Sequence, residues 1–369
     1  MKWSSGWVID SPRQPGVLPH SGCRQRRARI AASLQFASFD EESLSVTSMD
    51  MVRSRNVWAC GSNPCRTFFL SESDGQTGLQ TYLYHMIRAF SNHTYTYWSH
   101  MEVKMPVTKV GDINLCYKVR GDGQPLILIA GLVTAQNAWF ALVRAFSKRY
   151  RVVTFDNRGI GGSDKPTGPY SMSMMARDTI GLMDHLGIDR AHILGGSMGG
   201  MIAQEMAIDH PQRVDKLILF STSADGQWLF DLAEATTPNW NRSRSDFASV
   251  DLRKLMGAIA SRTFNRPFYR LVFLPPLKLF LKLGMLKVPA GQIEACMMHN
   301  VLDRLHLIQA PTLVLTGSKD RLIAPHWSEV LASRITGAKL VSIDGGSHVL
   351  AGEMAGRFKK EVLGFSGSG

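Results

Sequence analysis

A serine enclosed by glycines is the first feature of the chain that could do chemistry. The segment HILGGSMGGMIAQEMA runs from His192 to Ala207 and places Ser197 between two pairs of glycines. An apolar run precedes it and a stretch of helical periodicity follows, so a strand should end and a helix begin at this serine. The pattern Gly195-x-Ser-x-Gly199 at such a junction is typical of a nucleophile on a sharp turn, where glycines remove colliding side chains. The simpler alternative is a packing turn with a solvated serine.

A nucleophilic serine needs a base and an acid that orients the base. His348, in DGGSHVLAGE, directly follows the last predicted strand, and we expect it to be the base. Asp320 follows the penultimate predicted strand and is the preferred acid, with Asp225, after LILFSTSA, as its rival. An aspartate in a turn is also common without any catalytic role. The chain order serine, aspartate, histidine favours a triad of Ser197, Asp320 and His348.

Attack on a carbonyl creates an oxyanion, which needs backbone N–H donors. We expect one donor to be the N–H of Met198, the residue after the serine, at the start of the predicted helix. The other should come from the loop after the apolar run PLILIAG, and we assign it to the N–H of Leu132. Each such donor typically contributes about 10²–10³ in rate.

The elements that must position these residues alternate from Met105 onwards. VTKVGDINLCYKVRG alternates around a Gly-Asp turn and predicts a hairpin, whereas short apolar runs such as Pro125–Gly131 and Arg151–Asp156 are typical of buried parallel strands. Helical patterns separate the later strands. This alternation predicts an α/β fold, a doubly wound and mostly parallel sheet of about eight strands with helices on both faces. Active residues then lie in loops at the carboxyl ends of strands.

Residues 224–305 interrupt this alternation after the sixth predicted strand, and we expect them to form a helical lid. The apolar stretch Arg266–Leu286 is too interrupted for an integral membrane span, because it contains basic residues and because Pro275–Pro276 should break any helix. A surface that touches lipid is the alternative to a lid. Aromatic side chains of this segment would either contact a hydrophobic substrate or pack internally: Trp228, Phe230, Phe268, Phe273 and Phe280.

Residues 1–100 have no sustained period of strand or helix, and we interpret them as a disordered or non-native N-terminal extension. The core then comprises residues 101–223 and 306–369. A small basic cluster at Arg24–Arg29 favours the alternative of a targeting segment. If the extension is dispensable, removal of residues 1–100 should leave activity intact, whereas a truncated chain that fails to fold would contradict this.

Composition narrows the class of protein further. The 369 residues are 44% hydrophobic and 20% charged, as in an ordinary globular protein. The net charge of +12 comes from scattered basic residues without a nucleic-acid-binding motif, so we expect no nucleic-acid partner. Five cysteines, of which only Cys60 and Cys65 lie close together, predict neither a disulfide framework nor a metal site. We therefore expect reduced thiols in a cytoplasmic protein, with no prediction of oligomeric state.

From Pro125 to about Leu363 the chain resembles the α/β-hydrolase superfamily. The matching segments, in the family's order, are LIAGLVTAQNAW, FDNRGIGGSDKP, GGSMGGMIAQEMA, PTLVLTGSKD and GGSH. The second is similar to the D-x-R-G-x-G-x-S motif of the branch that holds epoxide hydrolases, perhydrolases, enol-lactonases and small esterases. This resemblance implies mainly structural roles for Asp156, Arg158 and Asp164. The chain departs from the family at Ala130, where many members have histidine before the oxyanion-loop glycine.

The type of nucleophile divides this branch. Attack on sp³ carbon needs a carboxylate, which leaves a hydrolysable ester, whereas serine would leave an inert ether. Ser197 therefore predicts acyl chemistry without a cofactor or metal, on a small and hydrophobic carboxylic ester or lactone. Two alternatives remain open: a C–C bond hydrolase or cofactor-free perhydrolase with the same triad, and a non-catalytic binding protein of this fold.

Overall fold

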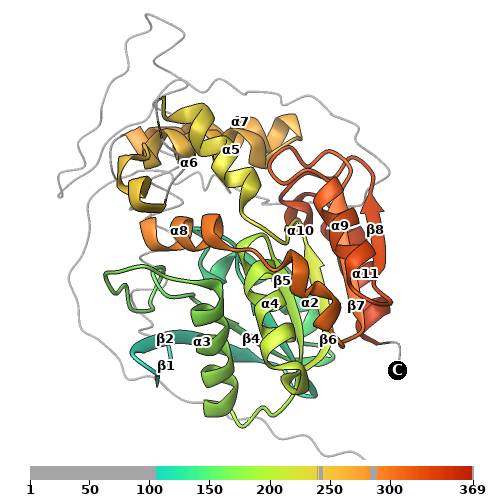
Figure 1. Cartoon of the computed structure of the whole chain (residues 1–369). Helices are drawn as coiled ribbons and strands as arrows, with labels where there is room; N and C mark the ends of the chain where they lie inside the picture. Colours follow the sequence, from blue (N-terminus) through green and yellow to red (C-terminus); the bar gives the residue numbers. More distant parts are fainter. Residues whose placement is uncertain (1–104, 239, 241–243, 283–288, 368–369) are drawn as a thin grey trace, which may run out of the picture. The chain divides into compact units, whose positions relative to one another are not determined.

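The computed structural model describes residues 105–238, 240, 244–282 and 289–367 (Figure 1). The extension predicted for residues 1–100 lies outside the described residues.

A mixed, eight-stranded sheet forms the centre of the described part, with strand order β1-β2-β4-β3-β5-β6-β7-β8. The pairs β1–β2 and β2–β4 are antiparallel, and the other neighbouring strands are parallel. The predicted doubly wound and mostly parallel sheet is thus confirmed. The strands are β1 Val107–Val110, β2 Ile113–Arg120, β3 Gln124–Ile129, β4 Tyr150–Phe155, β5 Ala191–Gly196, β6 Val214–Phe220, β7 Thr312–Gly317 and β8 Lys339–Ile343.

The predicted hairpin forms the antiparallel edge of this sheet. Strand β1 turns into β2 through Gly111 and Asp112, and Gly111 has a φ of +54°, which glycine adopts without strain. Strand β2 then pairs with β4, so the hairpin extends the parallel part of the sheet by two strands.

Both faces of the central strands are buried, which explains their unbroken apolar sequences. Along β6, Leu217 and Leu219 belong to one hydrophobic cluster, and Ile218 and Phe220 belong to a second cluster on the other face. Helices α3 Met172–His185, α4 Met198–Asp209 and α9 His326–Arg334 contribute to the first cluster. Helices α2 Phe140–Phe146 and α11 Ala355–Ser366 contribute to the second. Shorter helical segments are η1 Gln136–Trp139, η2 Pro211–Arg213 and α10 Leu350–Glu353.

The segment between β6 and β7 is helical in its described residues, as its sequence pattern predicted. It contains α5 Gln227–Thr236, η3 Arg244–Ser249, α6 Leu252–Thr263, α7 Pro267–Lys282, α8 Ala290–Met298 and η4 Leu302–Leu307. A β-bridge between Asp225 and Asn300 joins the two ends of this segment. Helices α5, α6 and α7 lie together at the top of Figure 1, and α8 lies between them and α4. That the segment between β6 and β7 acts as a lid stays a prediction.

Helix α7 corrects one expectation. We expected Pro275–Pro276 to break any helix, but α7 continues through both prolines from Pro267 to Lys282. A proline inside a helix removes one N–H donor, and its ring crowds the carbonyl four residues earlier, but α7 packs against α6, so tertiary contacts can outweigh this cost. No helix in the described part of the chain is both long and apolar enough to cross a membrane.

Candidate active site

Ser197 occupies a strained turn between β5 and α4. Its φ of +53° and ψ of −124° lie in a region that residues other than glycine rarely adopt, at a cost of about 1–3 kcal/mol. Contacts with the chain at the end of β6 hold this conformation. The Ser197 N–H donates to the Phe220 carbonyl at 3.0 Å, and the Ser197 carbonyl accepts from the Thr222 hydroxyl at 2.7 Å. The turn is thereby fixed on both sides of the serine.

The glycines around the serine are required by space. A side chain at Gly195 would overlap the backbone of Gly199 and Gly200. A side chain at Gly199 would overlap the carbonyls of Ile129 and Ala130 at the end of β3. Neither Gly195 nor Gly199 has a positive φ, so the close approach of β3, β5 and α4, and not backbone freedom, excludes larger residues.

The structure brings the predicted serine, histidine and aspartate together. The His348 Nε2 lies 3.1 Å from the Ser197 Oγ, and the His348 Nδ1 lies 2.9 Å from the Asp320 Oδ2. An ionised carboxylate only accepts hydrogen bonds, so His348 donates from Nδ1 and its Nε2 is free to accept from the serine hydroxyl. Asp320 and His348 are both at least nine-tenths buried. The arrangement can accept a proton from Ser197 and stabilise the resulting imidazolium.

The backbone of the loop after β7 fixes the Asp320 carboxylate. Its Oδ1 accepts from the N–H groups of Leu322 and Ile323 at 2.9 and 3.0 Å, which leaves Oδ2 for the histidine. The rival acid Asp225 instead accepts from the Gln227 N–H at 2.9 Å, and burial raises the pKa of its carboxyl. The structure therefore pairs His348 with Asp320 and not with Asp225.

The two predicted oxyanion donors flank the serine in different ways. Met198 is the first residue of α4, and N–H groups in the first turn of a helix have no partner within it. Leu132 follows Gly131, where a Cβ would lie 3.3 Å from the Ser197 Cβ. The oxyanion loop, residues 130–134, thus runs directly past the serine. Donation by the N–H groups of Leu132 and Met198 stays a prediction.

Residues of the FDNRGIGGSD motif make the structural contacts that the family resemblance implied. The buried Asp156 accepts from the N–H groups of Gln136 and Gly162 at 2.7 and 2.8 Å. Asp164 accepts from the backbone N–H and the side-chain amide of Asn114 at 2.8 and 2.9 Å. These bonds tie the loop after β4 to β2 and to the start of η1.

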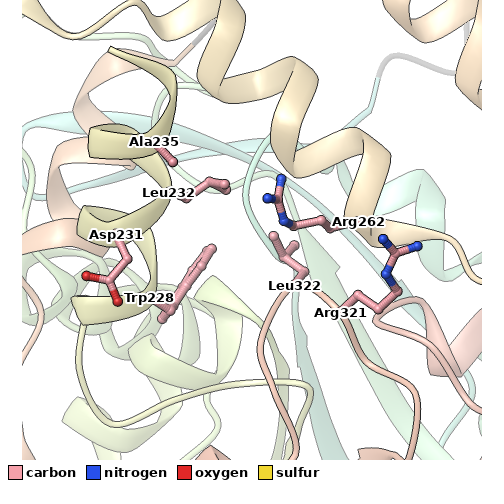
Figure 2. Close-up of a pocket in the computed structure, with 7 residues that line it drawn as sticks. All are labelled: Trp228, Asp231, Leu232, Ala235, Arg262, Arg321 and Leu322. Carbon is pink, nitrogen blue, oxygen red and sulfur yellow. The ribbon is translucent and has the colours of Figure 1, made fainter. Parts of the chain in front are cut away.

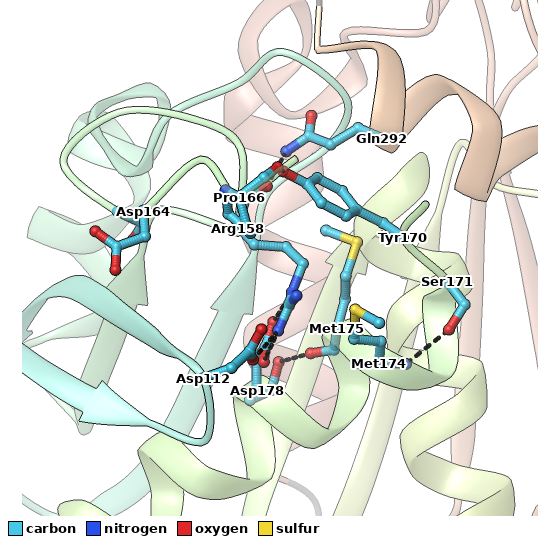
Figure 3. Close-up of polar contacts among 12 residues, drawn as sticks. Asp112, Arg158, Asp164, Pro166, Tyr170, Ser171, Met174, Met175, Asp178 and Gln292 are labelled. Atoms are coloured by element: carbon cyan, nitrogen blue, oxygen red, sulfur yellow. Dashed lines mark hydrogen bonds and ion pairs between the residues drawn. The ribbon is translucent and has the colours of Figure 1, made fainter. Parts of the chain in front are cut away.

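Arg158 anchors the same loop through a buried ion pair. Its guanidinium donates to both carboxylate oxygens of Asp178 on α3 at 2.6 and 2.7 Å, and to Asp112 at 3.1 Å (Figure 3). Burial raises the pKa of the Asp178 carboxyl, and the hydrogen bonds from Arg158 oppose that rise. The side chain of Arg158 points toward Asp112 and Asp178, whereas its backbone carbonyl accepts from Gln292 of α8 at 2.8 Å (Figure 3).

Sequence reasoning missed two residues that contact the oxyanion loop. The Asn157 side chain, in the same motif, donates to the Ala130 carbonyl at 3.0 Å. The Gln292 side-chain carbonyl accepts from the Val133 N–H at 3.3 Å. Both amides are buried. Asn157 lies within the FDNRGIGGSD motif, but nothing in the sequence around Gln292 indicates a contact with a residue 159 positions away.

A pocket of about 200 Å³ lies between α5, α6 and the loop after β7 (Figure 2). Arg321 and Leu322, which follow Asp320, contribute to its wall. The other lining residues are Trp228, Asp231, Leu232, Ala235 and Arg262. The pocket therefore combines apolar surface with charged side chains of both signs.

The structure describes the side chains of two of the five predicted aromatic residues, and these two have different surroundings. Trp228 lines the pocket, whereas Phe230 stacks on Trp240 with ring centroids 5.6 Å apart. The side chains of Phe268, Phe273 and Phe280 lie outside the described residues.

No group of three potential metal-ligating side chains gathers in the described ranges. Cys116 and Cys296 are buried and unpaired, and burial raises the pKa of both thiols, so neither is suited to act as a nucleophile.

Comparisons with known proteins agree with this geometry. The relatives include a candidate carbamate hydrolase, RutD, of Azorhizobium caulinodans, 27% identical over 71% of this chain and 98% of the relative. They also include 3-oxoadipate enol-lactonase 2 of Acinetobacter baylyi, 29% identical over 68% of this chain and 92% of the relative. The crystal structure of the enol-lactonase from Burkholderia xenovorans LB400 is 27% identical and superposes with a TM-score of 0.60, covering 71% of this chain and all of that one.

The family described as "alpha/beta hydrolase fold" matches residues 124–353. These residues include the serine turn, Asp320 and His348, together with the helical segment between β6 and β7. Because they make up more than half of the chain, the protein belongs to the family of hydrolases with the alpha/beta hydrolase fold.

Proposed function

We propose that the protein is a serine hydrolase that cleaves carboxylic esters or lactones through an acyl-enzyme. The single observation that carries this proposal is the continuous hydrogen-bonded chain from Asp320 through His348 to Ser197, with the serine on a strained turn. A serine that only packs in a turn would not need a buried histidine and a buried carboxylate aligned behind it.

The geometry supports a two-step reaction. His348 Nε2 takes the hydroxyl proton as Ser197 Oγ attacks the carbonyl carbon, and the N–H groups of Met198 and Leu132 stabilise the oxyanion. The imidazolium, stabilised by Asp320, then protonates the leaving alkoxide, and the serine ester remains. Water, deprotonated by His348, attacks this ester and releases the carboxylic acid and the serine hydroxyl.

Two observations support esters and lactones as the substrate class. The relatives named as enol-lactonases cleave acyl–oxygen bonds by name, and the chain spans nearly all of each of them. The pocket beside the Asp320 loop is not lined by Ser197 or His348, and we propose that its Trp228 indole and Leu232 take an apolar group of the substrate. Arg262 and Arg321 in the same pocket are a reason to include substrates that carry a carboxylate.

Covalent labelling tests the nucleophile. A fluorophosphonate probe should label the wild-type chain and leave the Ser197→Ala variant unlabelled, and this substitution should lower turnover by about 10⁶-fold. Equal labelling of both chains, or none of the wild type, would contradict the catalytic proposal and favour a binding protein.

A substrate panel then tests the acyl class. It should compare p-nitrophenyl esters of increasing chain length, ω-carboxylate esters, lactones and a carbamate, with a vinylogous diketone and peracetate formation as arms for C–C cleavage and perhydrolysis. We expect the highest kcat/KM on an ester or lactone, abolished by Ser197→Ala. A higher kcat/KM on the diketone or on the carbamate would reassign the substrate class.

A further inference from the structure

Gln292 connects the helical segment between β6 and β7 to the oxyanion loop. It lies on α8, its side chain is fully buried, and both ends of its amide are used. The Nε2 donates to the Arg158 carbonyl at 2.8 Å and the Oε1 accepts from the Val133 N–H at 3.3 Å. One partner is an acceptor and the other a donor, so only this orientation of the amide satisfies both.

The bond from Val133 coincides with backbone strain. Val133 has a φ of +56°, which is unusual for a β-branched residue, and its side chain is 39% exposed, so side-chain burial does little to stabilise this conformation. The residue occupies the third position of a turn closed by the Thr134 N–H and the Gly131 carbonyl at 3.2 Å, a position that favours glycine or asparagine. The hydrogen bond to Gln292 therefore supports a turn that the local sequence disfavours.

This turn contains the predicted oxyanion donor. The Leu132 carbonyl accepts from the Thr134 hydroxyl at 3.0 Å, and the adjoining Val133 N–H is held by Gln292, so the peptide that follows Leu132 is fixed at both ends. Asn157 holds the Ala130 carbonyl on the other side of Gly131. The Gly131–Leu132 peptide, which carries the Leu132 N–H, therefore lies between two peptides that side chains hold in place.

We propose that Gln292 is a positioning residue for catalysis, which holds the strained Val133 peptide so that the Leu132 N–H faces the developing oxyanion. The inference rests on the proposed function, because it assigns a role within that reaction. Gln292 is anchored through the Arg158 carbonyl to a loop that the buried ion pair with Asp178 fixes to α3. A movement of α8 would thus be transmitted to the oxyanion loop.

The test first replaces the Gln292 amide and then relieves the backbone strain at Val133. Gln292→Met keeps the length of the side chain and loses both hydrogen bonds. We expect kcat on the best ester to fall by about 10- to 100-fold, less than or comparable to the loss of one oxyanion donor, with KM changed less than about threefold. In a Val133→Gly background the turn no longer needs support, so the same substitution should lower kcat by less than about fivefold.

Gln204→Met is the matched control. Gln204 is also fully buried, and its amide nitrogen donates to the Ser223 carbonyl at 3.0 Å, in the loop after β6, whereas its Oε1 has no hydrogen-bond partner in the described structure. Gln204→Met removes one hydrogen bond and Gln292→Met removes two, so we expect the smaller loss of Tm in Gln204→Met, with its kcat within about twofold of the wild type.

Two results overturn the inference while the proposed function stands, provided that the wild type is active and labelled. In the first, the Gln292→Met variant keeps its kcat. In the second, Gln292→Met lowers kcat equally in the wild-type and the Val133→Gly backgrounds. A wild type that is neither labelled by fluorophosphonate nor active on any ester overturns the proposed function and this inference together.

Discussion

Replacement of Asp320 by asparagine tests the triad with little change to the fold. The Oδ1 of the wild-type carboxylate accepts from the Leu322 and Ile323 N–H groups, and an asparagine oxygen can keep both bonds. The amide NH₂ would then face the Nδ1 of His348. Because two donors cannot pair, the imidazole must move its proton to Nε2, which then can no longer accept from Ser197.

The expected loss follows from this change of tautomer. In a Ser-His-Asp triad, loss of the correct histidine tautomer lowers kcat by about 10⁴-fold, so we expect a loss of that order here. At about 1.4 kcal/mol per factor of ten, this corresponds to about 5 kcal/mol of lost transition-state stabilisation. The free energy of unfolding should change by no more than about 1–2 kcal/mol, because the backbone contacts of Oδ1 persist.

The assay compares Asp320→Asn with Asp225→Asn on the same p-nitrophenyl ester, with urea unfolding of both. The Asp225 carboxylate accepts from the Gln227 N–H through Oδ1, which an asparagine oxygen can also do, so this variant should keep kcat within about threefold. If Asp320→Asn retains more than a tenth of the wild-type kcat while folded, or if Asp225→Asn is the more damaging change, the assignment of the acid is wrong.

Three further outcomes follow from other parts of the structure. Gly199→Ala should lower the free energy of unfolding by about 1–3 kcal/mol and ester turnover at least about tenfold, because its methyl group would overlap a carbonyl at the end of β3. The control is Gly257→Ala on α6, where the space around the glycine is open. In the same assays this control should keep or raise the free energy of unfolding and leave ester turnover unchanged. Burial lowers the pKa of His192 below its ordinary value of 6.5, so at low pH the unfolded chain binds a proton more readily than the folded chain does. The free energy of unfolding, measured in urea, should therefore fall as the pH drops below about 6.5. The variant His192→Gln should show a weaker dependence on pH. Arg158→Met leaves the buried Asp178 carboxylate unpaired and should cost about 3–5 kcal/mol of unfolding free energy in urea, and a loss below about 1 kcal/mol would refute the importance of this ion pair.

The sheet and the triad could be predicted because both depend on local patterns. Each strand of the parallel part contains apolar residues and is directly followed by a small or polar residue, and the carboxyl ends of parallel strands meet at one edge. Ser197, Asp320 and His348 follow β5, β7 and β8, so the sequence placed them at the same edge of the sheet, and their chain order favoured a triad. Gly195 and Gly199 marked the serine turn in the sequence, because the close packing at that turn excludes any side chain at these positions.

The support of the oxyanion loop could not be predicted in this way. Gln292 lies in a helix whose sequence pattern indicates only burial, and its partners Val133 and Arg158 come from loops after β3 and β4. Helix α7 failed as a prediction for a related reason, because the packing that carries it through Pro275–Pro276 comes from α6 and not from its own sequence. Neither feature follows from the sequence pattern of a single element.

The backbone strain of the described part is concentrated where the candidate chemistry takes place. Its three non-glycine residues with positive φ are Val133, Ser197 and Ser221, and they follow β3, β5 and β6 at the same edge of the sheet. The strained residues also support one another's loops: Ser197 donates to the carbonyl of Phe220, which directly precedes Ser221, and Ser221 donates to the carbonyl of Leu315 on β7. At about 1–3 kcal/mol each, such conformations persist only when buried neighbouring strands fix them. The serine and the oxyanion loop are therefore held in place before any substrate binds, and the oxyanion stabilisation that we propose for the N–H groups of Leu132 and Met198 requires such preorganisation.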